Sequence, residues 1–308
     1  MQDARGSARS RPGAPALDGL DRRLIAEVVA DPAAPYTVWA ERLGVSDRTV
    51  TRRYLALRDR DVVRVRGRTV PGFDGRLAWL TRTVGTPTAM ARLGAVVAGF
   101  PHSRWVRLSA DGTELTAGLV TSGRGEDVVL SGLTGRRGAE RTRVVELLRV
   151  WGSSRAVDRA PRPLDAADRA LLDALAADGR ASLAQLAHAT GLSPSTASRR
   201  RAQLVEEGVV YFEADVDVRA LGEDGDALVW ITAAPGAIRR VGRILADLPE
   251  VRFVAATSGP TSLVANVVAS SAGDLVDVID THLDLSGVHH AEIAPQGPVL
   301  KRSPSGWG

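Results

Sequence analysis

The chain has 308 residues, which is long enough for about two domains of ordinary size. Its hydrophobic content of 44% and charged content of 25% are close to those of globular proteins, so general disorder is excluded. The absence of cysteine excludes a disulfide scaffold, a thiol nucleophile and a zinc site with cysteine ligands. The longest apolar stretches are too short to span a bilayer, and the first residues lack the apolar core of a secretory signal. We therefore expect a cytoplasmic protein with no membrane partner.

The formal net charge of +4 is distributed unevenly, because the first 164 residues are net positive and the remainder is net negative. Of the 40 basic residues only Lys301 is a lysine. Arginine is the better bidentate partner for phosphates and guanine edges, but a GC-rich coding genome also favours arginine whatever the function. The arginine content alone therefore indicates little about function.

The chain repeats itself at an offset of about 147 residues. The segment LDGLDRRLI (residues 17–25) matches LDAADRALL (residues 164–172), and LGVSDRTVTRR (residues 43–53) matches TGLSPSTASRR (residues 190–200). Residues 87–122 align without a gap on the segment 148 positions later, with 13 identical residues. We therefore expect two copies of one unit.

The expected boundaries follow from this repeat and from local composition. The serines, charges and two prolines of residues 153–163 suit an exposed linker between the copies. The expected divisions are a basic disordered tail over 1–16, a helical domain over 17–70, a sandwich domain over 71–152, the linker over 153–163, a second helical domain over 164–222, a second sandwich over 223–300 and a tail over 301–308.

Each copy is expected to begin with three helices, which are clearest in the second copy. The capping side chains there are Asp165, Ser182 and Ser193, and glycines at positions 179, 191 and 208 follow the helices. A short helix, a glycine turn and a capped helix with Ser, Thr and Arg on one face are the elements of a helix-turn-helix, whose last helix can enter the major groove. An ordinary three-helix bundle with solvated arginines is the alternative. Residues 209–218 look like the strands of a small wing.

The hydrophobic period changes beyond residue 222. The expected strands are 227–232, 251–257, 262–269 and 288–300, and the expected helices are 237–248 and 271–283. The order β-α-β-β-α-β predicts a ferredoxin-like sandwich. The expected fold class is therefore α+β, with two tandem copies of a winged helix-turn-helix followed by a ferredoxin-like βαββαβ sandwich.

Residues 164–210 resemble the helix-turn-helix of the Lrp/AsnC (feast/famine) transcriptional regulators, and the sandwich resembles that family's RAM domain, which senses amino acids and oligomerises. The resemblance implies binding of double-stranded DNA through the third helix of each copy. The residues that it assigns to DNA are Arg48, Thr49, Thr51, Arg52 and Arg53 in the first copy, and Ser195, Thr196, Ser198, Arg199 and Arg200 in the second.

The resemblance also places an effector near the turn between the second and third sandwich strands. The effector-binding residues expected there are Asp111, Gly112 and Glu114 in the first copy, and Ser258, Gly259, Thr261 and Ser262 in the second. The family's turn usually reads G-x-Y-D, and of the two copies only Glu114 keeps an acid at the last position. Since an α-amino group prefers a carboxylate, any response to an amino acid is expected to depend on Glu114 rather than Ser262.

We therefore expect a sequence-specific transcriptional regulator, not an enzyme, that binds a small effector and forms a homodimer or larger homo-oligomer. The alternative is an amino-acid-sensing or metabolic enzyme subunit that uses the sandwich as a ligand module; the doubled helix-turn-helix argues against it. No cofactor, catalytic residue or metal site is expected. His289 and His290 are neighbours in an expected strand, so their side chains point to opposite faces. The two sandwiches could pair within one chain or between chains.

Overall fold

The computed structural model describes residues 17–69, 73, 76–100, 102–121, 139–151, 163–222, 224–283 and 285–302. The expected tail over residues 1–16, most of the expected linker and most of the last eight residues lie outside the described ranges. Within those ranges, no helix is long and apolar enough to cross a membrane.

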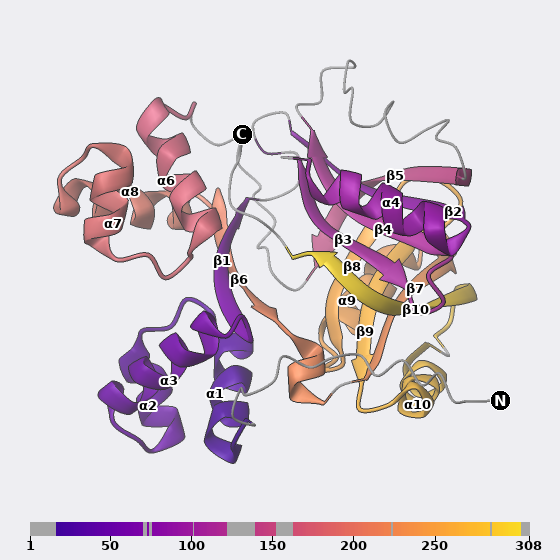
Figure 1. Cartoon of the computed structure of the whole chain (residues 1–308), viewed down its shortest axis with the longest axis horizontal. Helices are drawn as coiled ribbons and strands as arrows, with labels where there is room; N and C mark the ends of the chain where they lie inside the picture. The colour runs from indigo at the N-terminus through magenta and orange to yellow at the C-terminus, as the bar shows by residue number, and fades with distance from the viewer. Residues whose placement is uncertain are drawn as a thin grey trace.

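Two groups of three helices lie on one side of the molecule, and a β-barrel lies on the other (Figure 1). The first head comprises α1 (Gly19–Ala30), α2 (Tyr36–Leu43) and α3 (Asp47–Asp59). The second head comprises α6 (Ala166–Ala177), α7 (Leu183–Thr190) and α8 (Pro194–Glu206).

The helices of the second head begin at the three capping residues that the sequence predicts, and two helices of the first head have caps at the matching positions. Asp18 in the first head and Asp165 in the second each form a capping box with the aspartate three residues later. Ser46 caps α3 and Ser193 caps α8. The glycine between the second and third helices has a φ of 70° in both heads, a left-handed conformation that other residues adopt only at a cost. These local signals explain why both heads form the predicted trihelical arrangement.

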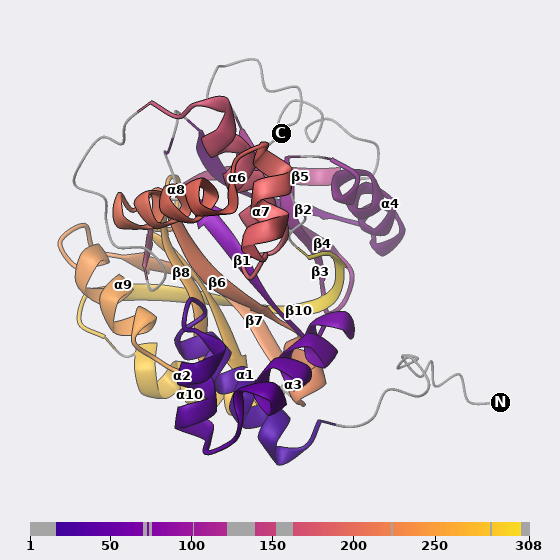
Figure 2. The ribbon, with the colours of Figure 1, turned by 90° about the vertical axis from the view of Figure 1, so that its left-hand side faces the viewer.

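The strands that follow the two heads pair with each other. β1 (Val63–Thr69) runs antiparallel to β6 (Val210–Val216), and the two form a ribbon between the heads and the barrel (Figure 2). The expected small wing is replaced by this ribbon, because the strand that pairs with β6 comes from the other half of the chain. The helices support the ribbon closely: a Cβ atom added at Gly67 would lie 2.9 Å from the Cβ atom of Leu175 in α6.

Eight strands close the barrel in the order β10-β3-β4-β2-β5-β8-β9-β7. Their bounds are β2 Leu77–Gly85, β3 Ser103–Ser109, β4 Glu114–Thr121, β5 Ala139–Trp151, β7 Gly225–Ala233, β8 Val251–Thr257, β9 Leu263–Ala269 and β10 Val288–Lys301. The long strands β5 and β10 each pair with strands from both halves of the chain. Closure within one chain leaves no free sheet edge in the barrel.

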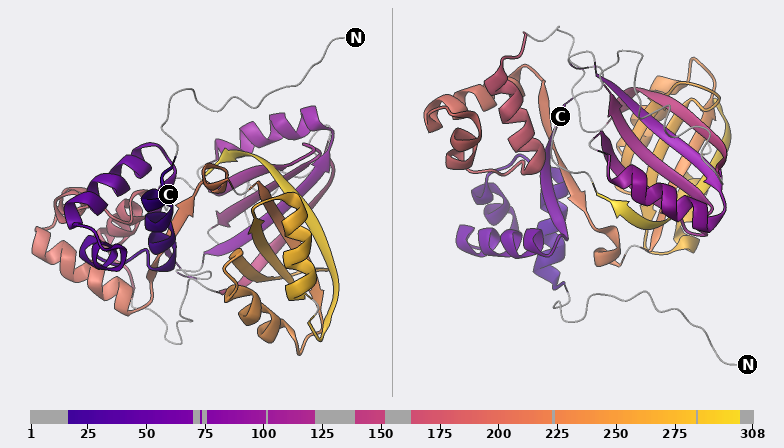
Figure 3. Two further views of the ribbon diagram at one scale, coloured as in Figure 1. Left: turned by 90° about the horizontal axis from the view of Figure 1, so that it is seen from below. Right: turned by 45° about the horizontal axis from the view of Figure 1, so that its top comes forward.

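Helices cover the outside of the barrel (Figure 3). They are α4 (Pro87–Ala98), α9 (Ile238–Ala246) and α10 (Ala272–Leu283), and a short 3-10 helix, η2 (Val218–Leu221), follows β6. The second half therefore has the predicted order β7-α9-β8-β9-α10-β10. The first half has the order β2-α4-β3-β4-β5 in its described residues.

The inside of the barrel is an apolar core to which both halves contribute. Leu80 and Val145 of the first half pack with Leu228 and Trp230 of the second, and Trp230 is only 1% exposed. Trp105 and Phe253 pack against this same cluster. The two halves thus pair within the one chain that the structure describes.

Candidate nucleic-acid interface and effector loops

The third helices of the two heads expose matching positions. Arg48 and Arg52 are exposed on α3, four residues apart and therefore on one face of the helix. Ser195 and Arg199 are exposed on α8 with the same spacing, at the positions that the repeat aligns with the first pair. Each head therefore presents a polar face near the beginning of its third helix, with two arginines in the first head and one in the second.

The predicted threonines lie closer to the helix caps. The Thr49 hydroxyl is 2.9 Å from the hydroxyl of Ser46, and the Thr196 hydroxyl is 2.9 Å from that of Ser193. Both threonines are half-buried, as are the other two small polar residues assigned to DNA, Thr51 and Ser198. These four side chains lie beside the exposed faces rather than at their centres.

The remaining two predicted arginines form ion pairs inside the heads. Arg53 Nη1 lies 2.6 Å from Asp18 Oδ2 and 2.7 Å from Asp21 Oδ1. In the second head, Arg200 Nη1 lies 2.5 Å from Asp165 and 3.1 Å from Asp168. Each guanidinium therefore ties the third helix to the N-terminal cap of the first helix.

We call each of these arginine–aspartate ion pairs a clamp. Neither clamp was predicted from the sequence, although the sequence carries a signal for both. The pattern D-x-x-D followed by an arginine 32 residues after the second aspartate occurs identically in both copies. Hydrogen bonding to Arg200 lowers the pKa of Asp165 to about 2, and the pKa of Asp18 is also lowered, by the backbone N–H of Asp21 and then by Arg53.

The clamp predicts an acid-sensitive second head. The folded pKa of Asp165 lies below its unfolded value, so the pair stabilises the protein above about pH 4 and loses this effect as the pH falls toward 2. Asp165→Asn keeps a good capping residue but removes the charge. We expect its melting temperature to be below that of the parent at pH 7, and this difference to shrink toward pH 2 in thermal melts followed by circular dichroism. A difference that stays constant with pH would show that the ion pair contributes nothing.

The β3–β4 turn contains the first set of expected effector residues. Asp111 accepts hydrogen bonds from the Ser109 hydroxyl (2.5 Å), the Thr113 backbone N–H (3.1 Å) and the Thr113 hydroxyl (2.8 Å). These bonds, with the Ser109 hydroxyl first, lower the pKa of Asp111. Gly112 has a φ of 74°, as the tight turn requires. Asp111 and Gly112 thus build the turn itself.

Glu114 is 7% exposed and already has a cationic partner. Arg82 of β2 donates from Nε to Glu114 across 2.8 Å, and its Nη1 lies 2.9 Å from Glu292 of β10. The guanidinium also lies 5.4 Å from the ring centre of Trp230. These hydrogen bonds, to Glu292 first, raise the pKa of Arg82. Arg82 therefore joins the two halves of the barrel and neutralises the carboxylate that was expected to receive an amino group.

The β8–β9 turn makes its hydrogen bonds to other strands. The Ser258 hydroxyl accepts from the Glu146 N–H of β5 (2.8 Å), and the Ser262 hydroxyl donates to the Ala233 carbonyl of β7 (2.9 Å). Thr261 is 9% exposed, and its hydroxyl has no hydrogen-bond partner among the residues that the structure describes. The two sets of expected effector residues are thus anchored to different strands.

Comparison with known proteins gives three domain matches. Residues 17–58 match the AsnC-type helix-turn-helix domain, residues 164–211 match a winged helix-turn-helix DNA-binding domain, and residues 226–295 match the Lrp/AsnC ligand binding domain. The matches to helix-turn-helix domains fall on the two heads, and the ligand binding domain falls on the second half of the barrel.

Two transcriptional regulators align with about two fifths of the chain. The HTH-type transcriptional regulator FL11 of Pyrococcus horikoshii is 32% identical over 127 residues, which are 41% of this chain and 84% of the relative. The HTH-type transcriptional regulator LrpA of Mycobacterium tuberculosis is 36% identical over 118 residues, 38% of this chain and 79% of the relative.

A solved structure resembles the chain over nearly its whole length. The siroheme decarboxylase NirDL superposes with a TM-score of 0.66, covering 94% of each chain at 13% sequence identity. At this identity the likeness concerns the fold alone.

Proposed function

Because the chain belongs to the Lrp/AsnC family of helix-turn-helix transcriptional regulators, we propose that it is a sequence-specific DNA-binding regulator whose two heads read DNA and whose barrel binds a small effector. The observation that carries this proposal is the pair of matching exposed faces on α3 and α8. We propose a regulator rather than an enzyme, since the resemblance to a decarboxylase extends only to the fold.

We further propose that the chain is a tandem duplication in which one chain holds both units of a regulator. The antiparallel β1–β6 ribbon and the barrel shared by two halves support this proposal. The closed barrel already covers the inner sheet face of each half with the other half. Assembly of two or more chains remains a proposal based on the family.

Three arginines are the proposed DNA contacts: Arg48, Arg52 and Arg199. They are exposed on the third helices, where a guanidinium can reach phosphates and the edges of bases. Ser195 occupies the fourth matching position and offers a hydroxyl. Since Arg53 and Arg200 are held by aspartates, we assign them to supporting the helices instead. The first head should therefore supply more of the phosphate contact.

For the effector we propose the β8–β9 turn of the matched ligand binding domain. The buried Thr261 hydroxyl there has no partner within the described part of the chain and can bond with a ligand, whereas an amino group arriving at Glu114 would have to displace Arg82. This preference reverses the one drawn from sequence, which favoured Glu114 over the second loop.

DNA binding can be tested with duplexes that the purified protein selects from a random pool. The logarithm of affinity falls with the logarithm of salt by about 0.9 for each phosphate contact. We expect the double variant Arg48→Ala/Arg52→Ala to flatten the slope by about 2 and Arg199→Ala by about 1. Arg92→Ala, at an exposed position of α4 on the barrel, is the control and should leave the slope unchanged. Failure to select any duplex would refute the proposed function, and an unchanged slope in the double variant would remove the first head from the interface.

A further inference from the structure

An arginine of the second head inserts among the aromatic side chains of the first head. Arg180 lies in the turn between α6 and α7, and its guanidinium carbon is 4.2 Å from the ring centre of Tyr36, 4.5 Å from Trp39 and 6.0 Å from Tyr54. Its Nη1 also donates to the backbone carbonyl of Ala34. A guanidinium over aromatic faces is attracted by the ring electrons, and the attraction grows as water is excluded.

The aromatic receptor is part of the core of the first head. Trp39 and Tyr54 are fully buried, and each of the three rings lies within 6 Å of the other two. The Tyr54 hydroxyl accepts a hydrogen bond from the Val65 N–H of β1 (3.2 Å), and burial raises the pKa of Tyr54 to about 12. The receptor therefore stays uncharged and is fixed both to α3 and to the ribbon.

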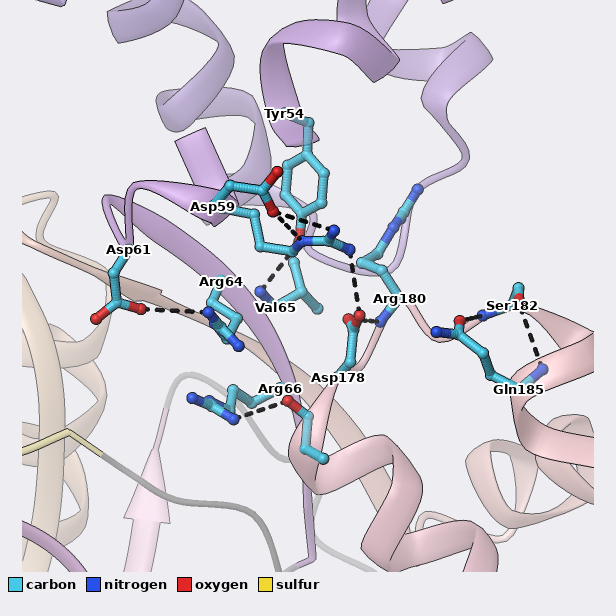
Figure 4. Close-up of polar contacts among 12 residues, drawn as sticks. Tyr54, Asp59, Asp61, Arg64, Val65, Arg66, Asp178, Arg180, Ser182 and Gln185 are labelled. Atoms are coloured by element: carbon cyan, nitrogen blue, oxygen red, sulfur yellow. Dashed lines mark hydrogen bonds and ion pairs between the residues drawn. The ribbon is translucent and has the colours of Figure 1, made fainter. Parts of the chain in front are cut away.

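The same turn of the second head is fastened to the first head and to β1 by further contacts (Figure 4). The Gly179 N–H donates to the Val65 carbonyl (2.9 Å), and Arg58 of α3 pairs with Asp178 (3.4 Å). Arg66 of β1 donates to the Ala177 carbonyl at the end of α6 (2.8 Å). The heads are thus joined by a docked turn as well as by the strand ribbon.

This docking occurs once, because the residues that it needs are present in one copy only. At the repeat offset of 147, Arg180 corresponds to Ala33, Gly179 to Pro32 and Arg66 to Glu213. Alanine has no cation, proline has no N–H to donate, and a carboxylate cannot donate to a carbonyl. The reciprocal contact of the first head on β6 therefore cannot form.

The three aromatic residues of the receptor likewise occur in the first head and not at the matching positions of the second. The residues that correspond to Tyr36, Trp39 and Tyr54 in the second head are leucine, leucine and Arg201. Arg201 lies 5.2 Å from the ring of Phe212 on β6, within its own half of the chain. In a symmetric homodimer every interface contact occurs twice. The contact of Arg180 with the aromatic residues, called the lock below, occurs once and therefore requires two different units.

We propose that Arg180 is a positioning residue that holds the two third helices at one relative placement, so that the protein reads two unlike half-sites at a single separation. The inference rests on the proposed DNA-binding function. Two heads that are locked together can meet only those half-sites whose spacing matches their own, since half-site spacing follows the geometry of the protein. Without Arg180 the β1–β6 ribbon and the contacts of Asp178, Gly179 and Ala177 still connect the heads. The turn of the second head then loses its contact with the aromatic side chains, so the second head can shift over a wider range.

The placement of the heads can be measured without DNA. Because the chain has no cysteine, Ala56→Cys on α3 and Ala202→Cys on α8, both at exposed positions, would carry the only two spin labels. We expect one narrow distance distribution in the parent and a distribution at least about twofold wider with Arg180→Ala, as a locally released element samples more states. Arg42→Ala is the matched control, because Arg42 pairs with Glu27 and Asp31 inside the first head.

The effect on DNA reading is measured with a selected duplex into whose centre 2, 5 or 10 base pairs are inserted. An insertion of 5 base pairs turns one half-site by about half a helical turn, so we expect at least about a tenfold loss of affinity for the parent and a loss of less than about threefold with Arg180→Ala. Tyr36→Leu, which copies the residue of the second head, should act like Arg180→Ala and serves if that variant does not fold.

The outcomes separate the two proposals. If the parent selects no duplex, the DNA-binding function fails, and the spin-label distances still test the lock. If Arg180→Ala or Tyr36→Leu keeps the narrow distance distribution, or binds DNA with the same steep dependence on spacing as the parent, the role of Arg180 is overturned.

Discussion

Replacing Arg82 by leucine should lower the free energy of unfolding by about 3–5 kcal/mol, since it leaves the buried carboxylate of Glu114 without its cation. The side chains of Arg82 and Glu114 are 14% and 9% exposed, so water cannot take over the lost interaction. The same guanidinium also holds Glu292 from the other half of the barrel. Urea unfolding followed by circular dichroism measures the loss.

Two companion variants show whether the unpaired charge is the cause. In the double variant Arg82→Leu/Glu114→Leu no buried charge remains, and stability should recover by more than half. Glu292→Gln should cost less than about 1 kcal/mol, because the Glu292 side chain is 45% exposed and exposed pairs contribute little. A cost below about 1 kcal/mol for Arg82→Leu itself would contradict the assignment of Arg82 as the link between the halves.

Truncating Trp39 to alanine should cost about 3–5 kcal/mol, the range for large aromatic residues in a core. Trp39 is fully buried between Tyr36 and Tyr54, and its indole N–H donates to the Asp31 carbonyl (3.2 Å). The loss includes its contact with Arg180 from the second head. Thermal and urea unfolding of Trp39→Ala give the magnitude.

The second head offers the matched comparison. Leu186 occupies the corresponding position and is also fully buried, so Leu186→Ala should cost about 2–5 kcal/mol. Trp39→Leu, which copies that residue, should cost less than Trp39→Ala but should still weaken the docking of Arg180. Equal stability of Trp39→Leu and the parent would mean that the aromatic pocket contributes nothing beyond its apolar volume.

The parts of the fold that could be predicted from sequence are those with local causes. Asp165 and Ser193 mark helix starts because their own side chains accept hydrogen bonds from the free backbone N–H groups three residues later. The strand and helix order of the second half follows in the same way from hydrophobic spacing. By contrast, the pairing of β1 with β6 joins residues about 150 positions apart, such as Val63 and Val216, and no local pattern encodes such a partner.

Among the site residues, too, the features set by local spacing could be predicted, whereas those set by packing between elements could not. Helical spacing places Arg48 and Arg52 on an exposed face, which the structure has. The same spacing cannot reveal that Arg53, one residue further, meets the aspartates of α1, since that depends on how two helices pack. Glu114 looked like a free acid because its partner Arg82 is 32 residues earlier in the chain and on a different strand.

The ribbon also affects how the chain is made on the ribosome. β1 is complete at residue 69, but β6 starts at residue 210, so at 5–20 residues per second β1 waits about 7–30 s for its partner. A strand with an unpaired edge can meanwhile pair with another nascent chain. Arg64, Arg66 and Arg68 alternate along β1, and such charges on an open edge disfavour that pairing. These arginines thereby protect the unfinished protein, and Arg66 afterwards takes part in joining its two heads.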